Sequence, residues 1–387
     1  MIKFRKFKDR MMMMKKVLIF YGSYGGGHLS AAKAVEDYIR EHYDADVQIV
    51  DCIEYVNKFV NKITTKFYEY LAKKLPLVWG YVYKKSKKGI IARISNFSNK
   101  LMAHKLYHLI QDFSPDYVIS THPFSSQMCA YLKKKEKCTF PLATIMTDYA
   151  PHDQWLLYHE QVNYFFVAHD GMKQSLIQKG INQEKIHVSG IPLSSRFLQH
   201  YPKKEVLEQF GLQPHKKTVL FFGGGKMGLG KSRTLEILKI LASKFYDLQI
   251  IAISGKNQEL YQRFEEIVKE NHREDSIKVL EYTDKVPELM SISDFVITKP
   301  GGLTTTESLA SGLPMIITNP IPGQEEENAE FLEEERVGIW LKEEDNINEK
   351  LSTILSNPSK MQEMKSKAQL LAKKNSTQTI CKTIFNG

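Results

Sequence analysis

The chain has 387 residues, of which 42% are hydrophobic and 25% are charged. It is long enough for two domains with complete cores, and its composition excludes a disordered chain. No run of about 18 uncharged apolar residues occurs, which argues against a membrane-spanning helix, and four scattered cysteines without metal-ligand spacing predict free thiols in a reducing cytoplasm.

The net charge of +10 is concentrated in one segment. Residues 58–107 contain eleven lysines and one arginine but a single acid, Glu69, so the rest of the chain is close to neutral. Residues 1–14 are expected to form a basic tail, because Lys15 and Lys16 interrupt the apolar run that a signal peptide would need.

The first predicted strand, residues 15–21, leads into a glycine-rich turn and a helix that runs to about residue 43. Gly26 and Gly27 in the turn would allow close approach to a ligand. His28 follows them at the carboxyl end of a parallel strand, where α/β sheets bind ligands. The histidine is either structural or a proton-transferring group.

The basic segment has an amphipathic pattern. Apolar residues recur at helical spacing over residues 59–71 beside a stripe of lysines, and Trp79 and Tyr81 follow. Next comes a cluster formed by Lys84, Lys85, Lys87 and Lys88. This composition suits an anionic membrane surface. A core helix with a solvated lysine face and a nucleic-acid site are the alternatives.

Polar clusters follow two more predicted strands, 116–120 and 142–146. The second cluster contains Asp148, which is an alternative base, a partner that orients a histidine, or a helix cap. Further strands are predicted at 47–50, 164–167 and 185–188. Residues 15–200 are therefore predicted to form the N-terminal domain, with a hinge at 194–205.

The second domain, predicted at residues 201–360, begins with a strand at 218–222 and a loop that contains Gly224 and Gly225. Residues 225–232 fit the P-loop pattern of nucleotide triphosphatases. No later apolar run ends in the aspartate that such an enzyme needs for magnesium, so the loop is interpreted as a phosphate-binding turn of another fold. A P-loop NTPase remains the rival.

A strand at 294–298 is followed by a glycine turn and a helix at 304–311. The backbone N–H groups of Gly302, Leu303 and Thr304 would open that helix and suit a diphosphate. Glu307, one turn further, could accept hydrogen bonds from two ribose hydroxyls. Strands at 249–253, 277–280 and 315–318 and a short edge strand after residue 333 complete the predicted sheet.

The loop after the strand at 315–318 ends in Gln324 and Glu325, whose side chains could bind sugar hydroxyls, and Asn328 lies close enough to contact phosphate. Residues 346–385 are predicted to form two helices. The stretches KPGGLTTTE (299–307), GLP (312–314) and PGQEEEN (322–328) occur in this order. In these residues the chain resembles glycosyltransferase family 28, especially its processive diacylglycerol β-glucosyltransferases and monogalactosyldiacylglycerol synthases.

The resemblance implies the GT-B fold, an α/β architecture of two Rossmann-like domains facing across a cleft, with the C-terminal helix within residues 361–387 crossing back to the first domain. It also implies inverting transfer of glucose from UDP-glucose to diacylglycerol, with His28 as the catalytic base and residues 58–107 at the acceptor and the membrane. The expected location is the cytoplasmic face of the cell membrane. No metal cofactor and no nucleic-acid partner are expected.

Several activities remain open within this resemblance. The donor could be UDP-galactose, as in a monogalactosyldiacylglycerol synthase, or the acceptor a polyprenyl-diphosphate sugar, as for the related enzyme MurG. A regulator that binds a UDP-sugar without turnover would retain Glu307 but could dispense with His28. Because His28 is present, an enzyme is the favoured interpretation.

Overall fold

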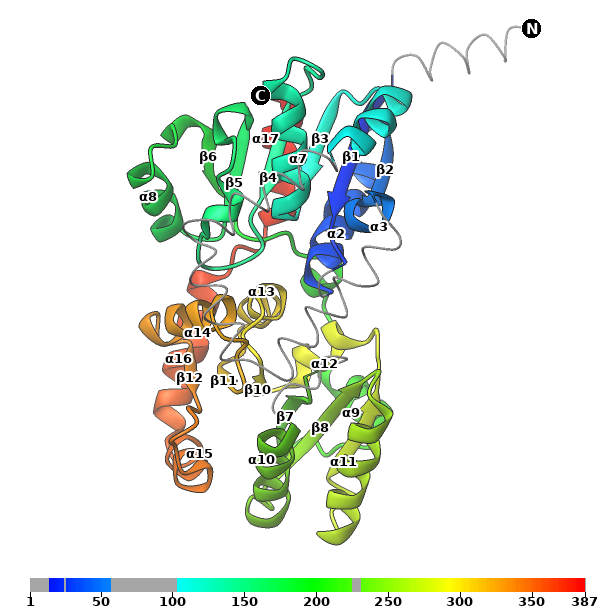
Figure 1. Cartoon of the computed structure of the whole chain (residues 1–387). Helices are drawn as coiled ribbons and strands as arrows, with labels where there is room; N and C mark the ends of the chain where they lie inside the picture. Colours follow the sequence, from blue (N-terminus) through cyan, green and yellow to red (C-terminus); the bar gives the residue numbers. More distant parts are fainter. Residues whose placement is uncertain (1–13, 24–25, 57–102, 225–230, 387) are drawn as a thin grey trace, which may run out of the picture. The chain divides into compact units, whose positions relative to one another are not determined.

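The structure is a computed structural model that describes residues 14–23, 26–56, 103–224 and 231–386. These residues form two compact units (Figure 1). Of the described residues, those up to Ser195 and those from Lys373 belong to unit 1, and Arg196–Ala372 belong to unit 2. Unit 2 thus begins at Arg196, slightly before the border expected at residue 200. The chain re-enters unit 1 at Lys373, later than the expected residue 361.

Unit 1 is built on a six-stranded parallel sheet with the order β2-β1-β3-β4-β5-β6. Its strands are β1 (Lys15–Tyr21), β2 (Ala45–Asp51), β3 (Tyr117–Ser120), β4 (Leu142–Ile145), β5 (Tyr164–Val167) and β6 (Ile186–Val188). Chain order reverses between β1 and β3, which makes the carboxyl ends of these two strands the topological switch point of the sheet.

Helices connect these strands. They are α2 (Gly27–His42), α3 (Cys52–Val56), α7 (Pro123–Lys134), α8 (Asp170–Gln178) and α17 (Ser376–Asn386), with single turns η1 (Asp153–Trp155), η2 (His159–Gln161) and η3 (Gln183–Lys185). Residues 103–113 are also helical. Helix α17 packs against α2, and its Ile380 and Ile384 are buried in the same apolar cluster as Val35 and Ile39. The last helix of the chain is therefore part of the core of unit 1.

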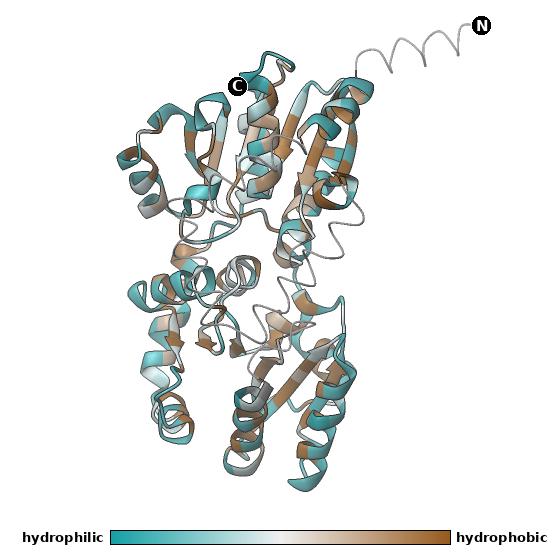
Figure 2. Cartoon of the chain, in the orientation of Figure 1, coloured by the Kyte–Doolittle hydropathy of each residue, from teal (hydrophilic) through white to brown (hydrophobic). Residues whose placement is uncertain are grey.

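Unit 2 contains the second parallel sheet, with the order β12-β11-β10-β7-β8-β9. Its strands are β7 (Lys217–Phe222), β8 (Leu248–Gly255), β9 (Ile277–Glu281), β10 (Phe295–Thr298), β11 (Met315–Ile317) and β12 (Gly338–Trp340). The switch point lies between β7 and β10, because β8 follows β7 on one side while β10 pairs with β7 on the other. Most residues of the strands in both sheets are hydrophobic, as the colouring in Figure 2 shows, which is the pattern of parallel sheets buried by flanking helices.

The helices of unit 2 are α9 (Lys203–Gln209), α10 (Lys231–Lys244), α11 (Gln258–Glu270), α12 (Val286–Ile292), α13 (Gly302–Ala310), α14 (Gln324–Glu334), α15 (Ile347–Leu355) and α16 (Pro358–Leu371), and the turn η4 (Ser195–Leu198) stands at its start. The core combines strand residues such as Phe221 and Phe295 with Ile237 and Leu241 of α10 and Leu351 of α15. Helix α13 packs on α16.

The predicted strands are confirmed with ends that differ by no more than two residues. The prediction of two helices over residues 346–385 is wrong, because three form: α15, α16 and α17. Pro358 starts a new helix at its first position, with the Asn357 side chain capping it by accepting from the Lys360 N–H. Residues 372–375 then carry the chain from unit 2 to unit 1.

Candidate active site

His28 lies at the switch point of unit 1. It is the second residue of α2, which follows β1, and it contacts the residue that follows β3: its Nδ1 is 2.7 Å from the carbonyl oxygen of Thr121. The Thr121 hydroxyl in turn donates to the backbone carbonyl of His28 at 2.9 Å. Two reciprocal hydrogen bonds therefore fix the histidine to the neighbouring strand end.

The contact with Thr121 determines which ring nitrogen of His28 carries the proton. A carbonyl oxygen can only accept, so Nδ1 must be the donor in a bond of this length. In the neutral ring this leaves Nε2 unprotonated and able to accept a proton. The hydroxyl oxygen of Thr147, in the loop after β4, lies 3.0 Å from the same Nδ1. This arrangement would allow His28 to act as a general base.

A second imidazole packs against the first. The rings of His28 and His122 meet edge to face, with centroids 4.6 Å apart. His122 precedes α7, and its Nδ1 accepts from the N–H of Phe124 at 3.2 Å. On its other side a Cβ at Gly22 would lie 2.7 Å from the His122 ring. The sequence therefore needs glycine at position 22 so that His122 can pack against the end of β1.

Burial lowers the pKa of His28 from 6.5 to about 4, opposed in part by its hydrogen bond to Thr121. Burial also holds the pKa of His122 well below its usual range, with His28 and His152 adding to the effect. Both rings are neutral at pH 7, so His28 is ready to accept a proton.

The other predicted residues of unit 1 lie around this centre. Asp148 directly follows Thr147 and is only 5% exposed. It does not cap a helix, since the next helical turn, η1, has His152 at its N-cap. Gly26 is the N-cap of α2, directly before Gly27, and a Cβ at Gly26 would meet no described atom within 4 Å. Internal packing therefore does not explain why this position is a glycine.

In unit 2 the two predicted phosphate-binding turns flank the switch point. The first follows β7, where Gly224 has a φ of 93°, a conformation that favours glycine. Gly223 cannot carry a side chain, because its Cβ would be 2.6 Å from Leu260. The second turn follows β10 and opens α13. Adjacent strand ends thus bring together two stretches that are about 80 residues apart in sequence.

The start of α13 has backbone donors that the helix itself does not pair. Its N-cap is Gly301, which has no side chain to cap the helix, and the first bond of the helix runs from the Thr305 N–H to the Gly301 carbonyl. The N–H groups of Gly302, Leu303 and Thr304 therefore have no partner within the helix. Together with the helix dipole, they form a site suited to an anion.

Glu307 lies one turn into α13, on the same helix as these N–H groups. Burial alone raises the pKa of its carboxyl from 4.5 to about 8. The carboxyl is thus largely protonated at pH 7 in the ligand-free protein. A polar ligand that donates hydrogen bonds to it would favour the ionised form.

Two residues predicted to contact the donor also brace the loops of unit 2. The carboxylate of Glu325 accepts from the Ile321 N–H at 2.7 Å and pairs with the Lys299 ammonium at 3.4 Å. The Asn328 side chain donates to the Pro300 carbonyl at 2.9 Å. These contacts join α14 to the glycine turn before α13. Gln324 is the first residue of α14 and is partly exposed.

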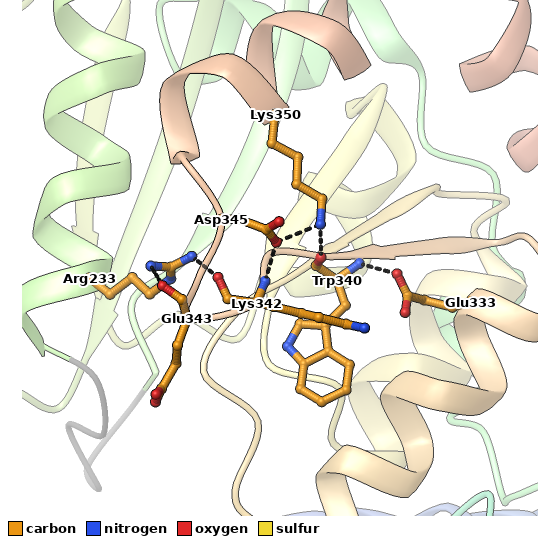
Figure 3. Close-up of polar contacts among 7 residues, drawn as sticks. All are labelled: Arg233, Glu333, Trp340, Lys342, Glu343, Asp345 and Lys350. Atoms are coloured by element: carbon orange, nitrogen blue, oxygen red, sulfur yellow. Dashed lines mark hydrogen bonds and ion pairs between the residues drawn. The ribbon is translucent and has the colours of Figure 1, made fainter.

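The first turn of α10 is anchored by an arginine, as Figure 3 shows. Arg233 donates to the backbone carbonyls of Lys342 and Glu343, in the loop after β12. Asp345 braces that loop by accepting from the Lys342 N–H at 2.6 Å and from the Lys350 ammonium at 2.5 Å. The network fixes the start of the helix that follows the first glycine turn.

Some predicted site residues lie outside the described part of the chain: Gly225, Trp79, Tyr81, Lys84, Lys85, Lys87 and Lys88. Among the described residues, none of the helices combines the length and apolar character needed to span a bilayer. The same residues contain no group of three or more histidines, cysteines or acids placed to bind a metal ion. All four cysteines are buried free thiols.

The sequence does not reveal the immediate partners of His28. Thr121, His122 and Thr147 belong to the polar clusters that follow two of the predicted strands. Their position at the carboxyl ends of β3 and β4 was the available signal. Which of them would contact His28 depends on strand order, which the sequence does not state. The sequence gives no indication of the contacts of Arg233, because its partners are backbone carbonyls, which every residue has.

Comparison with known proteins places this geometry in a fold class. The chain is similar over 96% of its length to the whole of MurG from Acinetobacter baumannii, with a TM-score of 0.64 and 14% sequence identity. It is also similar over 96% of its length to 96% of MnaA from S. aureus in a structure with UDP, with a TM-score of 0.59 and 15% identity. The two parallel sheets with these neighbours define the GT-B fold class.

Sequence comparison gives the family. Residues 28–193 match the profile of monogalactosyldiacylglycerol (MGDG) synthase, and residues 218–382 match the glycosyltransferase family 28 C-terminal domain. The chain is 31% identical over 377 residues to the processive diacylglycerol beta-glucosyltransferase of Bacillus pumilus, covering 96% of this chain and 94% of that protein. A protein of the same name from Bacillus cereus is 32% identical over 90% of this chain and 88% of its own length. The chain therefore belongs to glycosyltransferase family 28 and is a sugar-transferring enzyme.

The family resemblance found in residues 299–328 is confirmed, as is the expectation of an enzyme. The second profile spans the loop that fits the P-loop pattern, residues 225–232. This match favours a glycosyltransferase loop over the rival P-loop NTPase.

Proposed function

We propose that the protein transfers glucose from UDP-glucose to the free hydroxyl of diacylglycerol, with inversion, to give a β-glucosyl lipid. The single observation that carries the chemistry is the hydrogen bond that fixes the proton of His28 on Nδ1. It leaves Nε2 as a neutral base, and an inverting transfer needs one base for the acceptor proton. The names of the relatives support the choice of glucose and diacylglycerol.

In the proposed reaction the lipid hydroxyl oxygen attacks the anomeric carbon of glucose while Nε2 of His28 takes the hydroxyl proton. The bond between that carbon and the diphosphate oxygen breaks, and UDP leaves with the electron pair. The N–H groups of residues 302–304 would stabilise the charge that develops on the diphosphate. The mechanism uses backbone donors in this role, so activity should persist in the presence of a chelator.

Glu307 is assigned to the ribose of UDP. Its ionised carboxyl would accept from both hydroxyls, and those bonds would offset the burial that raises its pKa. Glu325 and Asn328 hold the loops around this site through Lys299 and Pro300, so their contribution to sugar and phosphate binding would be partly indirect.

UDP-galactose is a second candidate donor, because residues 28–193 match the MGDG synthase profile. Diacylglycerol in anionic micelles should be incubated with labelled UDP-glucose and, in parallel, with labelled UDP-galactose. The proposal expects the glucosyl lipid, with a proton coupling that identifies the β anomer. Galactosyl lipid alone would assign the second donor, and no lipid product would exclude diacylglycerol as the acceptor. Chromatography of the products would also show whether a second sugar is added.

The acceptor is a lipid, so the enzyme is proposed to work at the inner face of the cell membrane. The basic segment of residues 58–107 supports contact with an anionic surface through its lysines.

A further inference from the structure

The Nδ1 of His28 has two oxygen neighbours. The Thr121 carbonyl is 2.7 Å away and the Thr147 hydroxyl 3.0 Å away. Because the carbonyl can only accept, the single Nδ1–H points between two acceptors and the Thr147 oxygen accepts as well. If Nδ1 lacked its proton, its lone pair would face the carbonyl oxygen, which is unfavourable.

Thr147 is well placed to hold this geometry. It is 4% exposed and follows β4, whereas Thr121 follows β3 and His28 follows β1. The imidazole is thus held from two strand ends, and the His122 ring packs edge to face with it. A ring held in this way cannot turn without losing both hydrogen bonds to Nδ1.

The Thr147 hydroxyl contributes more to stability when the His28 ring is protonated. Burial disfavours the imidazolium that forms when Nε2 takes a proton. An oxygen that accepts from Nδ1–H stabilises the charged ring more than the neutral one, because hydrogen bonds from charged donors are stronger. In the same way, an acceptor bound to Nδ1–H of a catalytic histidine assists proton transfer at Nε2 by stabilising the imidazolium.

We propose that Thr147 is a positioning residue that acts through His28: its hydroxyl is the second acceptor for Nδ1–H, orients the ring and stabilises the imidazolium as Nε2 takes the acceptor proton. This inference rests on the proposed function, in which His28 is the base.

The test compares Thr147→Val, which keeps the shape and removes the hydroxyl, with Thr147→Ser, which keeps the hydroxyl. Thr147→Val should lower kcat about tenfold, the effect of losing one hydrogen bond to a charged group, and leave the affinity for UDP unchanged. Thr147→Ser should restore most of the turnover. Thr144→Val is the matched control, because Thr144 on β4 loses an equally buried hydroxyl bond, 2.6 Å to Ser126, without contact to His28.

A double-mutant cycle separates positioning from a general loss of stability. In a His28→Ala background, Thr147→Val should have no further effect on turnover, because the residue acts through the ring. Equal losses in both backgrounds, or full kcat in Thr147→Val, would overturn the proposal.

A nuclear magnetic resonance measurement tests the contact between Thr147 and His28 independently of the proposed function. In protein with 15N-labelled histidine, Thr147→Val should move the Nδ1–H signal of His28 and speed its exchange with water, whereas Thr144→Val should not. An unchanged signal would refute the contact itself. If His28→Ala kept full activity, the base assignment would fail even where this signal responds to Thr147.

Discussion

At the scale of single residues, burial keeps two ionisable groups uncharged at neutral pH. It lowers the pKa of His28 to about 4 and raises the pKa of Glu307 to about 8. Opposite shifts of this kind are typical of groups with separate roles in one reaction. A neutral imidazole can accept a proton. A protonated carboxyl can release its proton when a ligand donates hydrogen bonds that stabilise the carboxylate.

Replacement of His28 by alanine should lower kcat at least about 100-fold, which is the usual contribution of a general base. UDP affinity measured by calorimetry should stay within about twofold of wild type. His42→Ala is the matched control. His42 is on the same helix, and its Nδ1 likewise contacts a backbone carbonyl oxygen, that of Tyr38 at 3.0 Å, but its ring is exposed. Equal loss of turnover and UDP binding would remove His28 from the base role.

UDP affinity should depend on pH through Glu307. The carboxyl is neutral below about pH 8 in the free protein, and ribose hydroxyls favour its ionised form, so binding releases a proton. Linkage then requires affinity to rise as pH increases from 6.5 to 9, by about tenfold. Calorimetry at both pH values should show this slope in wild type and a flat, weaker profile in Glu307→Gln. A slope that survives the substitution would contradict the ribose assignment.

The same carboxyl should affect stability in the absence of ligand. Its folded pKa of about 8 is above the ordinary value of 4.5, so the folded protein binds more protons than the unfolded chain between these values. The stability associated with this group is present below about pH 4.5 and is lost as pH rises through 8. Thermal unfolding of ligand-free Glu307→Gln should therefore show a gain in Tm over wild type that is larger at pH 8 than at pH 5.

At the scale of elements, each unit places two loops at the carboxyl ends of the strands that flank its switch point. In unit 1 the residues next to these strand ends include His28 and Thr121, and in unit 2 they include Gly224 and Gly302. In unit 2, helix α13 begins there with the N–H groups of residues 302–304, which have no partner within the helix. The Arg233 contacts hold the first turn of α10, the helix that follows the glycine turn after β7 (Figure 3).

Substitution of Arg233 by methionine should lower the free energy of unfolding by about 1–3 kcal/mol, because two backbone carbonyls lose a charged donor. It should also weaken UDP binding if the first turn of α10 belongs to the donor site. Arg263→Met serves as the control, because Arg263 is exposed and pairs with Glu266, three residues further along α11. That change should stay within about 0.5 kcal/mol. Similar Tm values for the two variants would show that the anchor contributes little.

At the scale of the molecule, the chain leaves unit 1 after Ser195 and returns to it at Lys373. Helix α17 then completes the core of unit 1, with Ile380 and Cys381 fully buried. Among the described residues, the chain therefore passes between the two units at both ends of Arg196–Ala372. Charge is distributed unevenly as well, since residues 58–107 hold the net positive charge.

Neutralising Lys84, Lys85, Lys87 and Lys88 with glutamine should weaken binding to anionic vesicles about tenfold or more at low salt and less at high salt, because screening reduces the attraction. Co-sedimentation with vesicles measures the effect. A control with the same change in net charge replaces four exposed lysines of unit 2: Lys203, Lys204, Lys239 and Lys244. Equal losses in both variants would point to net charge rather than to this cluster.

Much of the local structure follows from the sequence. The apolar runs gave the strands of both sheets, because a parallel strand must be buried on both faces, and the glycines before Thr304 gave the start of α13. Residues 346–385 were predicted as two helices because helical composition continues there, whereas Pro358 and the passage back to unit 1 divide them into three.

The sequence by itself determined the two α/β repeats, the family and the residue types of the donor turns, since these depend on neighbours within about 10 residues along the chain. Only the tertiary structure decided that Thr121 and Thr147 meet His28, that Arg233 holds the loop after β12, and that burial shifts the pKa values of His28 and Glu307. These properties depend on strand order and on desolvation, which arise from residues far apart in sequence.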